Sequence, residues 1–170
     1  RLGNPATLKL TGDQTISMWI KPEDLSSRSN PYAKAYAGEG TITLETDGTL
    51  RYYYGTSGRD SGTYQSFATT APLESGKWTH IAVVRDLENM KLCWYMDGVL
   101  VNETDALYSY AQASNLSAYI GKGYAGRFNG MLDEVAVYRS ALTPDEIREV
   151  CSAGVDVLDA DMVAYYPFDG

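Results

Sequence analysis

The sequence is short of the residues from which metal centres and nucleophilic sites are usually built. Its 170 residues include only two cysteines, Cys93 and Cys151, and one histidine, His80. These three side chains cannot supply the four ligands of a structural zinc site, so we expect no zinc. A Cys93–Cys151 disulfide stays open as an alternative, because two cysteines in a chain of this length need not be bridged.

The chain also lacks long apolar runs and an excess of positive charge. No stretch of about 18 apolar residues occurs, so the sequence predicts no membrane insertion. There are 14 basic and 22 acidic residues, which give a net charge of −8. Nucleic acids and anionic membrane surfaces attract clustered cations, so neither is an expected partner.

Tyrosine, in contrast, is abundant: 14 tyrosines stand against 3 phenylalanines and 3 tryptophans. A tyrosine ring combines an apolar face with a polar tip, which suits a half-exposed sheet face and a sugar- or protein-binding surface. The plainer interpretation is that tyrosine fills strand positions because it is a good β-former.

Alternating segments rich in β-formers recur along most of the sequence. The predicted strands are 15–20, 41–45, 49–55, 78–85, 91–96, 99–103, 118–121, 131–138 and 162–166. Asp47-Gly48 and Asp97-Gly98 each separate two of these segments, and an Asp-Gly pair in that position is a strong hairpin signal. Strands at roughly 8–12-residue spacing with turn residues between them predict an all-β sandwich or barrel.

One short helix is predicted near the C-terminus. Residues 143–146 read Thr-Pro-Asp-Glu, which is a capping box with proline at the first helical position. The helix should run to about Ala153 and end at Gly154, which can adopt a left-handed conformation. Its apolar stripe consists of Ile147, Val150 and Cys151. Cys151 is therefore expected to be a packed thiol.

Five segments carry a resemblance to a known family. They are T-I-S-M-W-I-K-P (15–22), G-K-W-T-H-I-A-V-V-R (76–85), L-C-W-Y-M-D-G-V-L-V (92–101), Y-I-G-K-G (119–123) and F-N-G-M-L-D-E-V-A-V-Y-R-S-A-L-T-P-D-E-I (128–147). In order and spacing they resemble the laminin G-like jelly-roll domains of the concanavalin A-like lectin/glucanase superfamily. The resemblance implies an all-β, two-sheet antiparallel jelly-roll sandwich with one short C-terminal helix. It also implies a secreted or cell-surface protein, but it fixes no ligand, because this fold hosts many functions.

The last ten residues, D-M-V-A-Y-Y-P-F-D-G (161–170), resemble the stretch with which a family domain opens. We expect residues 1–170 to form a single domain, with 161–170 either completing the sandwich or opening a following repeat. The first alternative is favoured, because an unpaired strand would expose Val163, Tyr165 and Phe168.

The sequence does not predict an enzyme. Glycoside hydrolases of the resembling fold carry E-x-D-x-x-E on one strand, whereas Glu45-Thr46-Asp47 lacks the third carboxylate and Asp47 belongs to a turn. Asp133 and Glu134 are adjacent on a predicted strand and are therefore expected on opposite faces. His80 has no serine or cysteine motif near it, so we expect a structural histidine packed beside Trp78.

Calcium is the one cofactor that the resemblance implies. In the family a structural calcium often joins the opening loop to the aspartate of the last long strand. That resemblance points to Asp133, with Asp169 and the Gly170 carbonyl as partners. Strand alternation places Asp133 on the same face as Met131 and Val135, close to the core, unless Asp133 only hydrogen-bonds a loop.

The expected ligand surface combines loops at one end of the sandwich with its concave sheet. The candidate ligand-binding residues are Arg59, Asp60, Tyr108, Tyr110, Lys122, Tyr124 and Arg127. Aromatic rings stack on pyranose faces, and planar charged groups hydrogen-bond to hydroxyls. The leading hypothesis is a non-catalytic extracellular module that binds glycans, with or without calcium. The alternative is a structural or adhesive repeat that binds another surface protein, as in a bacterial surface array or a virion.

Overall fold

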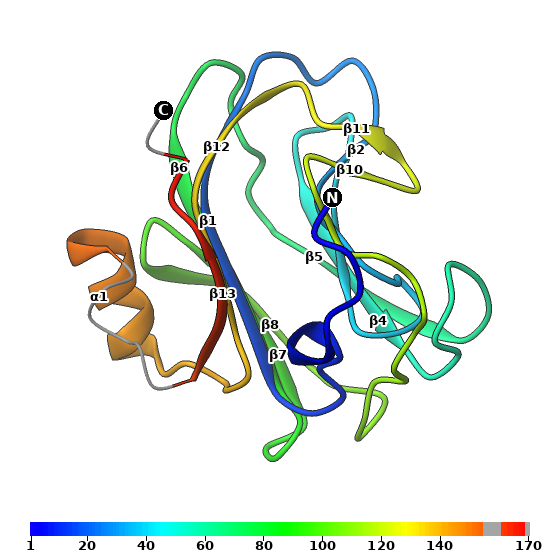
Figure 1. Ribbon diagram of the computed structural model, residues 1–170. Helices are drawn as coiled ribbons and strands as arrows, with labels where there is room; N and C mark the ends of the chain where they lie inside the picture. The colour runs from blue at the N-terminus through cyan, green and yellow to red at the C-terminus, as the bar shows by residue number, and fades with distance from the viewer. Residues whose placement is uncertain (155–160, 169–170) are drawn as a thin grey trace.

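The computed structural model describes residues 1–154 and 161–168, and it shows two β-sheets stacked face to face (Figure 1). One is a six-stranded sheet in the order β13-β12-β1-β6-β7-β8. Its strands are β1 (Gln14–Pro22), β6 (Thr79–Asp86), β7 (Lys91–Met96), β8 (Val99–Asp105), β12 (Gly130–Tyr138) and β13 (Met162–Tyr166). Every neighbouring pair in this sheet is antiparallel.

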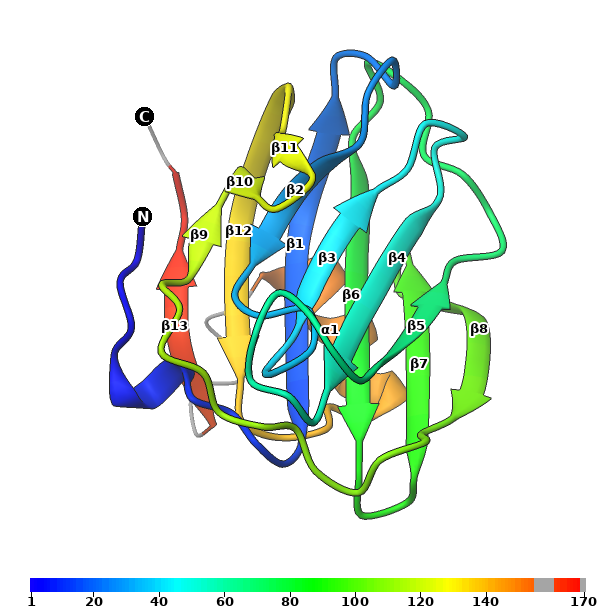
Figure 2. The ribbon, with the colours of Figure 1, turned by 90° about the vertical axis from the view of Figure 1, so that its right-hand side faces the viewer.

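The second sheet has seven strands and lies opposite the first (Figure 2). Its strands are β2 (Ser29–Ala33), β3 (Thr41–Leu44), β4 (Leu50–Gly55), β5 (Tyr64–Ala68), β9 (Tyr119–Ile120), β10 (Lys122–Gly123) and β11 (Gly126–Arg127). The path is β10-β11-β2-β3-β4-β5, and β9 also pairs with β2. The one parallel contact joins Arg127 to Asn30. The predicted two-sheet all-β fold is confirmed.

The two Asp-Gly hairpins are present where the sequence predicts them. Asp47 Oδ1 accepts hydrogen bonds from the Thr49 amide and hydroxyl, at 2.9 and 2.7 Å, and so closes the β3–β4 turn. Asp97 and Gly98, which join β7 to β8, both have positive φ, at 48° and 76°. A turn with two left-handed residues matches the right-handed twist of the strands that it connects.

The helix α1 (Pro144–Ala153) has the predicted cap and covers the outer face of the six-stranded sheet (Figure 1). The Thr143 side chain accepts a bond from the Glu146 amide, and the Glu146 carboxylate accepts one from the Thr143 amide. Ile147 and Val150 are buried against small or branched residues of the sheet. Cys93 and Cys151 are both free thiols, half-buried at this interface, so the alternative of a disulfide is not realised in the structure.

The strand β13 lies at the edge of the six-stranded sheet, beside β12 (Figure 2). Val135 pairs with Tyr166, and Val137 pairs with Ala164. Val163 and Tyr166 contact the main core between the sheets. A strand at this position shields part of that core, which is the arrangement that a completing strand requires.

A fully buried arginine, Arg85 on β6, connects the core to three other segments. Its guanidinium donates to the backbone oxygens of Leu10, Gly12 and Glu39, at 2.9, 2.9 and 2.6 Å. A fourth bond of 3.0 Å goes to the Tyr52 hydroxyl. Four acceptors compensate the desolvation of the charge, so this arginine is structural.

Candidate functional site

The outer face of the seven-stranded sheet presents aromatic and charged side chains that no helix covers. Strand β4 illustrates how an aromatic side chain reaches this face, because its three consecutive tyrosines alternate between the two faces of the sheet. Tyr52 and Tyr54 are buried in the core between the sheets, where their rings stack at 6.1 Å. Tyr53 points the other way and contributes its ring to the outer face.

Four tyrosines from four separate segments meet on this face; we call Tyr36, Tyr53, Tyr64 and Tyr124 the tyrosine face. Tyr36 lies at its centre, with ring centroids 4.8 Å from Tyr124, 5.2 Å from Tyr64 and 6.0 Å from Tyr53. Tyr64 and Tyr124 remain about two-fifths exposed, whereas Tyr53 is nearly buried beneath them. The cluster is therefore a fixed aromatic surface with two accessible rings.

An ion pair borders the tyrosine face. Arg28 donates two hydrogen bonds to Glu45, at 2.7 and 3.0 Å, in the bidentate geometry that arginine makes with carboxylates. The guanidinium also lies 5.8 Å from the Tyr124 ring and 3.4 Å from the Tyr124 hydroxyl. The hydrogen bond to Glu45 raises the pKa of Arg28, so the guanidinium stays charged at any physiological pH. The charges orient Tyr124 and leave planar polar groups at the edge of the rings.

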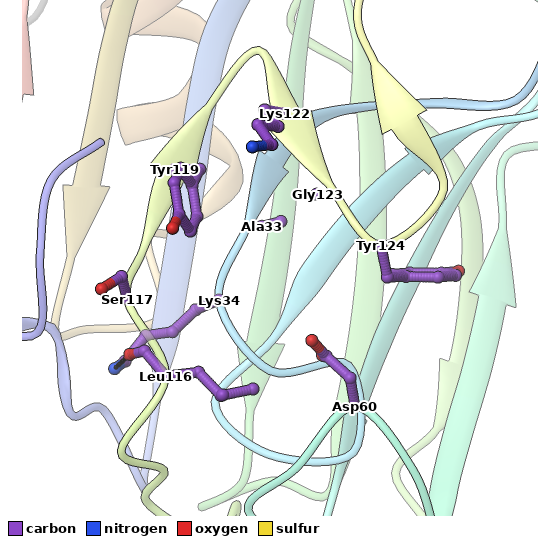
Figure 3. Close-up of a pocket in the computed structure, with 9 residues that line it drawn as sticks. All are labelled: Ala33, Lys34, Asp60, Leu116, Ser117, Tyr119, Lys122, Gly123 and Tyr124. Carbon is purple, nitrogen blue, oxygen red and sulfur yellow. Dashed lines mark hydrogen bonds between the residues drawn. The ribbon is translucent and has the colours of Figure 1, made fainter.

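Beside the tyrosine face lies a cavity of about 270 Å³. The residues that line it are Ala33, Lys34, Asp60, Leu116, Ser117, Tyr119, Lys122, Gly123 and Tyr124. Figure 3 shows Lys122 and Asp60 on opposite sides of the cavity, with Tyr119 at one end and Tyr124 at the other. The Lys122 ammonium lies 5.6 Å from the Tyr119 ring. The cavity thus presents opposite charges and two aromatic rings to a ligand.

Asp60 is held in place by the backbone of the tyrosine face. Its Oδ1 accepts a hydrogen bond of 3.1 Å from the Tyr36 amide. Desolvation and the nearby charge of Glu39 raise the pKa of Asp60, while the Tyr36 amide opposes them. A carboxylate whose pKa is raised by its surroundings is a common feature of ligand sites.

A buried ion pair forms the floor of the cavity. Lys34 Nζ lies 3.1 Å from Glu39 Oε1, and both side chains are almost fully buried. Lys34 also donates to Asn4 Oδ1 and to the Leu116 oxygen, at 2.6 and 3.2 Å. The Ser114 amide donates to Glu39 at 2.8 Å. The pair therefore fixes three distant segments under the site.

The structure brings together three of the seven ligand-binding candidates. Asp60, Lys122 and Tyr124 line the cavity. The other candidates do not line it: Arg59, Tyr108, Tyr110 and Arg127. Tyr108 packs against Tyr54 at a ring distance of 5.8 Å, and the backbone that follows Tyr110 bonds to Thr11. Tyr108 and Arg127 therefore do not share the cavity with Tyr124.

Several residues of this surface are not predicted from the sequence: Arg28, Lys34, Tyr36, Glu45, Tyr53, Tyr64 and Tyr119. One of them carried a usable signal, because alternation along the Tyr52-Tyr53-Tyr54 run places Tyr53 opposite its neighbours. The others come from segments that only the fold brings together.

The expectation for the face of Asp133 is wrong, because a β-bulge interrupts β12. Ser17 pairs with Ala136, but Trp19 pairs with Asp133, so β12 has one extra residue at this point. Glu134 adopts a left-handed conformation with φ of 49°. The bulge reverses the alternation, and Asp133 lies beside Trp19 on the outer face rather than towards the core.

The same bulge overturns the expectation that Asp133 and Glu134 occupy opposite faces, because both line one cavity with Trp19 and Trp78. Asp133 Oδ1 accepts a 2.9 Å bond from the Glu134 amide. The two other predicted calcium ligands, Asp169 and Gly170, lie outside the described residues. In the described part of the chain, no three His, Cys, Asp or Glu side chains are grouped as a metal site would require.

His80 is buried, as a structural histidine should be, but its ring partner is Trp19 rather than the predicted Trp78. Its Nε2 lies 2.9 Å from the Ser17 hydroxyl, and its Nδ1 has no partner among the described residues. Desolvation lowers the pKa of His80 to about 4. Asp97 hydrogen-bonds only the His80 amide, at 2.9 Å, so the arrangement is not a catalytic triad.

Comparison with known proteins identifies the class to which this fold belongs. The family model Laminin_G_3, described as the concanavalin A-like lectin/glucanases superfamily, matches residues 1–148. The chain therefore belongs to this family, and the resemblance seen in the sequence is confirmed. Among the described residues, no helix is long and apolar enough to cross a membrane.

Two solved structures are similar in fold. A candidate carbohydrate-binding protein from Bacteroides ovatus ATCC 8483 has a TM-score of 0.78 and 21% identity, covering 94% of this chain and 46% of that chain. Domain 4 of the extracellular arabinanase AbnA from Geobacillus stearothermophilus, solved with arabinotriose, has a TM-score of 0.68 and 25% identity, covering 87% and 70%.

A curated relative is the adhesion G-protein coupled receptor V1 of Danio rerio, which is 27% identical over 145 residues. That match covers 80% of this chain and 2% of the receptor. The chain thus spans less than half of the Bacteroides ovatus protein and a small fraction of the receptor.

Proposed function

We propose that this domain is a non-catalytic extracellular carbohydrate-binding module and that its glycan site comprises the tyrosine face and the adjoining cavity. The observation that carries the proposal is the open aromatic surface of Tyr36, Tyr64 and Tyr124 beside the charged groups of Asp60 and Lys122. The solved neighbours support it, since they include a candidate carbohydrate-binding protein and a domain bound to arabinotriose.

The chemistry of the site suits a sugar. The accessible rings of Tyr64 and Tyr124 offer apolar faces to the C–H groups of a pyranose or furanose. Asp60 accepts hydrogen bonds from hydroxyls, while Lys122 donates to ring or hydroxyl oxygens. The rigid ion pair of Lys34 and Glu39 below them keeps the site preformed, which lowers the entropy lost on binding.

A glycan array followed by calorimetry on the best ligand tests this function. Tyr124→Ala should weaken binding by about tenfold or more, which corresponds to roughly 1.4 kcal/mol of lost contact. Tyr110→Ala is the matched control, because Tyr110 is half-exposed and lies outside the cavity. Equal losses in the two variants, or an array without any signal, would contradict the proposed site.

The absence of catalysis is part of the proposal. Glu45 is engaged in the ion pair with Arg28, and Asp47 closes a turn, so neither is placed as a free acid or nucleophile. We expect no hydrolysis of β-glucans, agars, carrageenans or alginates. Turnover that disappears in Glu45→Gln or Glu134→Gln would show that the module is an enzyme.

Calcium at Asp133 is a separate proposal. Calcium takes six to eight oxygen ligands, and the described residues around Asp133 do not supply such a set. Phe168, which precedes Asp169 in the sequence, lines a cavity together with Asp133. Calcium should raise the melting temperature, and Asp133→Ala should abolish the increase. Identical melting curves in EDTA and in excess calcium chloride would exclude the ion.

One observation favours a protein-binding repeat as the second candidate. Trp78, Met131 and Phe168 are 38%, 50% and 52% exposed and line one open cavity. Such a patch is typical of contacts between proteins. If this surface is the functional one, Met131→Asp should abolish partner binding while Tyr124→Ala has no effect.

A further inference from the structure

A second cavity, distinct from the proposed glycan site, lies on the outer face of the six-stranded sheet. Its volume is about 370 Å³, and its lining consists of Trp19, Trp78, Asp133 and Glu134. Trp78 is 38% exposed, and the other three side chains are partly buried. Two indole rings and two carboxylates thus share one opening.

The bulge in β12 is the reason that both carboxylates face this cavity. In a regular strand Asp133 and Glu134 would point to opposite faces, but the extra residue and the left-handed Glu134 bring both to the same side. A non-glycine residue with a φ of 49° is uncommon and costs conformational energy. The strand therefore accepts strain at the one point that places two adjacent carboxylates beside Trp19.

Contacts from behind hold the lining in position. The buried His80 ring packs edge-on against Trp19, with centroids 5.5 Å apart, and hydrogen-bonds Ser17 at 2.9 Å. The Tyr165 hydroxyl donates to Glu134 Oε2 at 2.8 Å. Asp133 accepts the Glu134 amide through one oxygen, so each carboxylate has a second oxygen that these bonds do not use. The site is preorganised rather than assembled by a ligand.

The charges of the lining indicate the class of ligand. The lining contains two acids and no base. Lys21 lies on the same strand face as Trp19, but at the end of β1 opposite Met131. Indole faces attract cations through the ring quadrupole, and nearby carboxylates add direct charge attraction.

We propose that this cavity binds an alkylammonium group, such as a trimethylammonium or a methylated lysine side chain. Indole rings supply none of the oxygen ligands that calcium needs, so the aromatic part of the lining favours an alkylammonium group over a metal ion. A neutral sugar would use the rings but not the excess negative charge. The proposal does not depend on glycan binding at the tyrosine face.

Proton–nitrogen NMR with tetramethylammonium chloride as the probe tests the proposal, with EDTA present to remove calcium and sodium chloride to match ionic strength. The indole Nε1–H signals of Trp19 and Trp78 should shift in a saturable manner. The third tryptophan, Trp94, is fully buried and donates to the Phe67 oxygen at 3.0 Å, so its signal should not move. Trp94 therefore serves as the internal control.

Variants separate the aromatic and the electrostatic contributions. Glu134→Gln keeps the shape and should weaken tetramethylammonium binding about fivefold or more, whereas Trp78→Ala should weaken it about tenfold or more. Trp78→Phe, which keeps an aromatic face, should fall between Trp78→Ala and the parent. Tyr124→Ala should bind the probe like the parent protein, and each variant is first checked for an unchanged melting temperature.

Neutral tert-butanol, which has the same branched methyl surface without the charge, should bind at least about tenfold more weakly than tetramethylammonium. Equal binding of the two probes would overturn the proposal, because charge would then have no role. Non-saturable shifts, or full affinity in Glu134→Gln, would overturn it as well. Tight binding of a neutral monosaccharide that moves the same two indole signals would reassign the cavity to a sugar.

Discussion

The two sheets of the sandwich present outer faces of opposite character. On the six-stranded sheet, Ala82 and Ala136 are small enough for α1 to pack closely against the strands. On the seven-stranded sheet, the corresponding outward positions carry Tyr53, Thr43 and Arg51, and the Thr43 hydroxyl lies 3.1 Å from the Tyr124 hydroxyl. The same strand alternation thus produces a covered face for stability and an open face for recognition.

Different contacts hold the two outer faces in position. The covered face is held by apolar burial beneath a helix, whereas the open face is held by ring contacts and by the Arg28–Glu45 pair. Changes on the covered face should therefore alter stability and leave glycan affinity unchanged. Changes on the open face should do the reverse.

Removal of residues 161–170 should have the largest effect on the covered side. The truncation deletes β13 and exposes apolar surface of β12 on both faces of the sheet. We expect a loss of about 4 kcal/mol in the free energy of unfolding, because each large buried side chain contributes roughly 1.5–3 kcal/mol. Urea denaturation measures it. An unchanged midpoint would indicate that these residues belong to a following repeat instead.

Ile147→Ala should destabilise the domain by about 3 kcal/mol, because it opens a cavity under α1 at a fully buried position. Glycan affinity should not change, since Ile147 is on α1, which covers the six-stranded sheet, whereas the tyrosine face is on the seven-stranded sheet. Leu107→Ala is the control, because Leu107 is 66% exposed and should cost almost nothing. A loss of glycan affinity in Ile147→Ala would show that the two faces are coupled.

Acid should weaken the covered face through His80. Its pKa is about 4 in the folded protein, against an ordinary value of 6.5. Between these two pH values, His80 therefore binds a proton in the unfolded chain but not in the folded protein. The contribution of His80 to the free energy of unfolding is fully present above pH 6.5. It is lost as the pH drops towards 4, by about 3 kcal/mol in total. Chemical denaturation across this range should show a shallower dependence in His80→Gln. Parallel pH profiles for the two proteins would refute the assignment to His80.

The smallest effect on stability is expected on the open face. Arg28→Met breaks an exposed ion pair, and such pairs contribute about 0–1 kcal/mol to folding. Glycan affinity should nevertheless fall severalfold, because Tyr124 loses the group that orients its hydroxyl. Lys77→Met, which breaks the exposed pair with Glu74, should change neither property. If both variants bind glycans equally well, the Arg28–Glu45 pair has no part in the site.

The elements that the sequence predicts well are those fixed by local chemistry. The Asp-Gly turns and the Thr143 capping box specify their own geometry within four residues, and all are present. Four strands were missed: β2, β5 and the two-residue strands β10 and β11. Strand β2 contains Pro31, and proline usually interrupts a sheet because it has no backbone N–H to donate. Here the Asn30 side chain donates instead to the Ile42 oxygen of β3, at 3.0 Å.

The features that escaped prediction depend on long-range contacts. The bulge at Glu134 has no glycine or asparagine to mark it, so simple alternation placed Asp133 on the wrong face. The tyrosine face joins positions 36, 53, 64 and 124, and only the assembled sheet brings the other three rings within 6.0 Å of the Tyr36 ring. Tyr124 was a candidate from its glycine-rich loop, whereas Tyr36 and Tyr64 had no local signal.

The buried Arg85 has a consequence for how the chain folds. Its guanidinium is satisfied only when the segments of Leu10, Gly12 and Glu39 have all arrived around β6. A partly assembled sandwich would hold a dehydrated charge with missing acceptors, which penalises any half-formed intermediate. Folding should therefore proceed as one slow, cooperative step, as is typical of β-sandwiches whose contacts are distant in sequence.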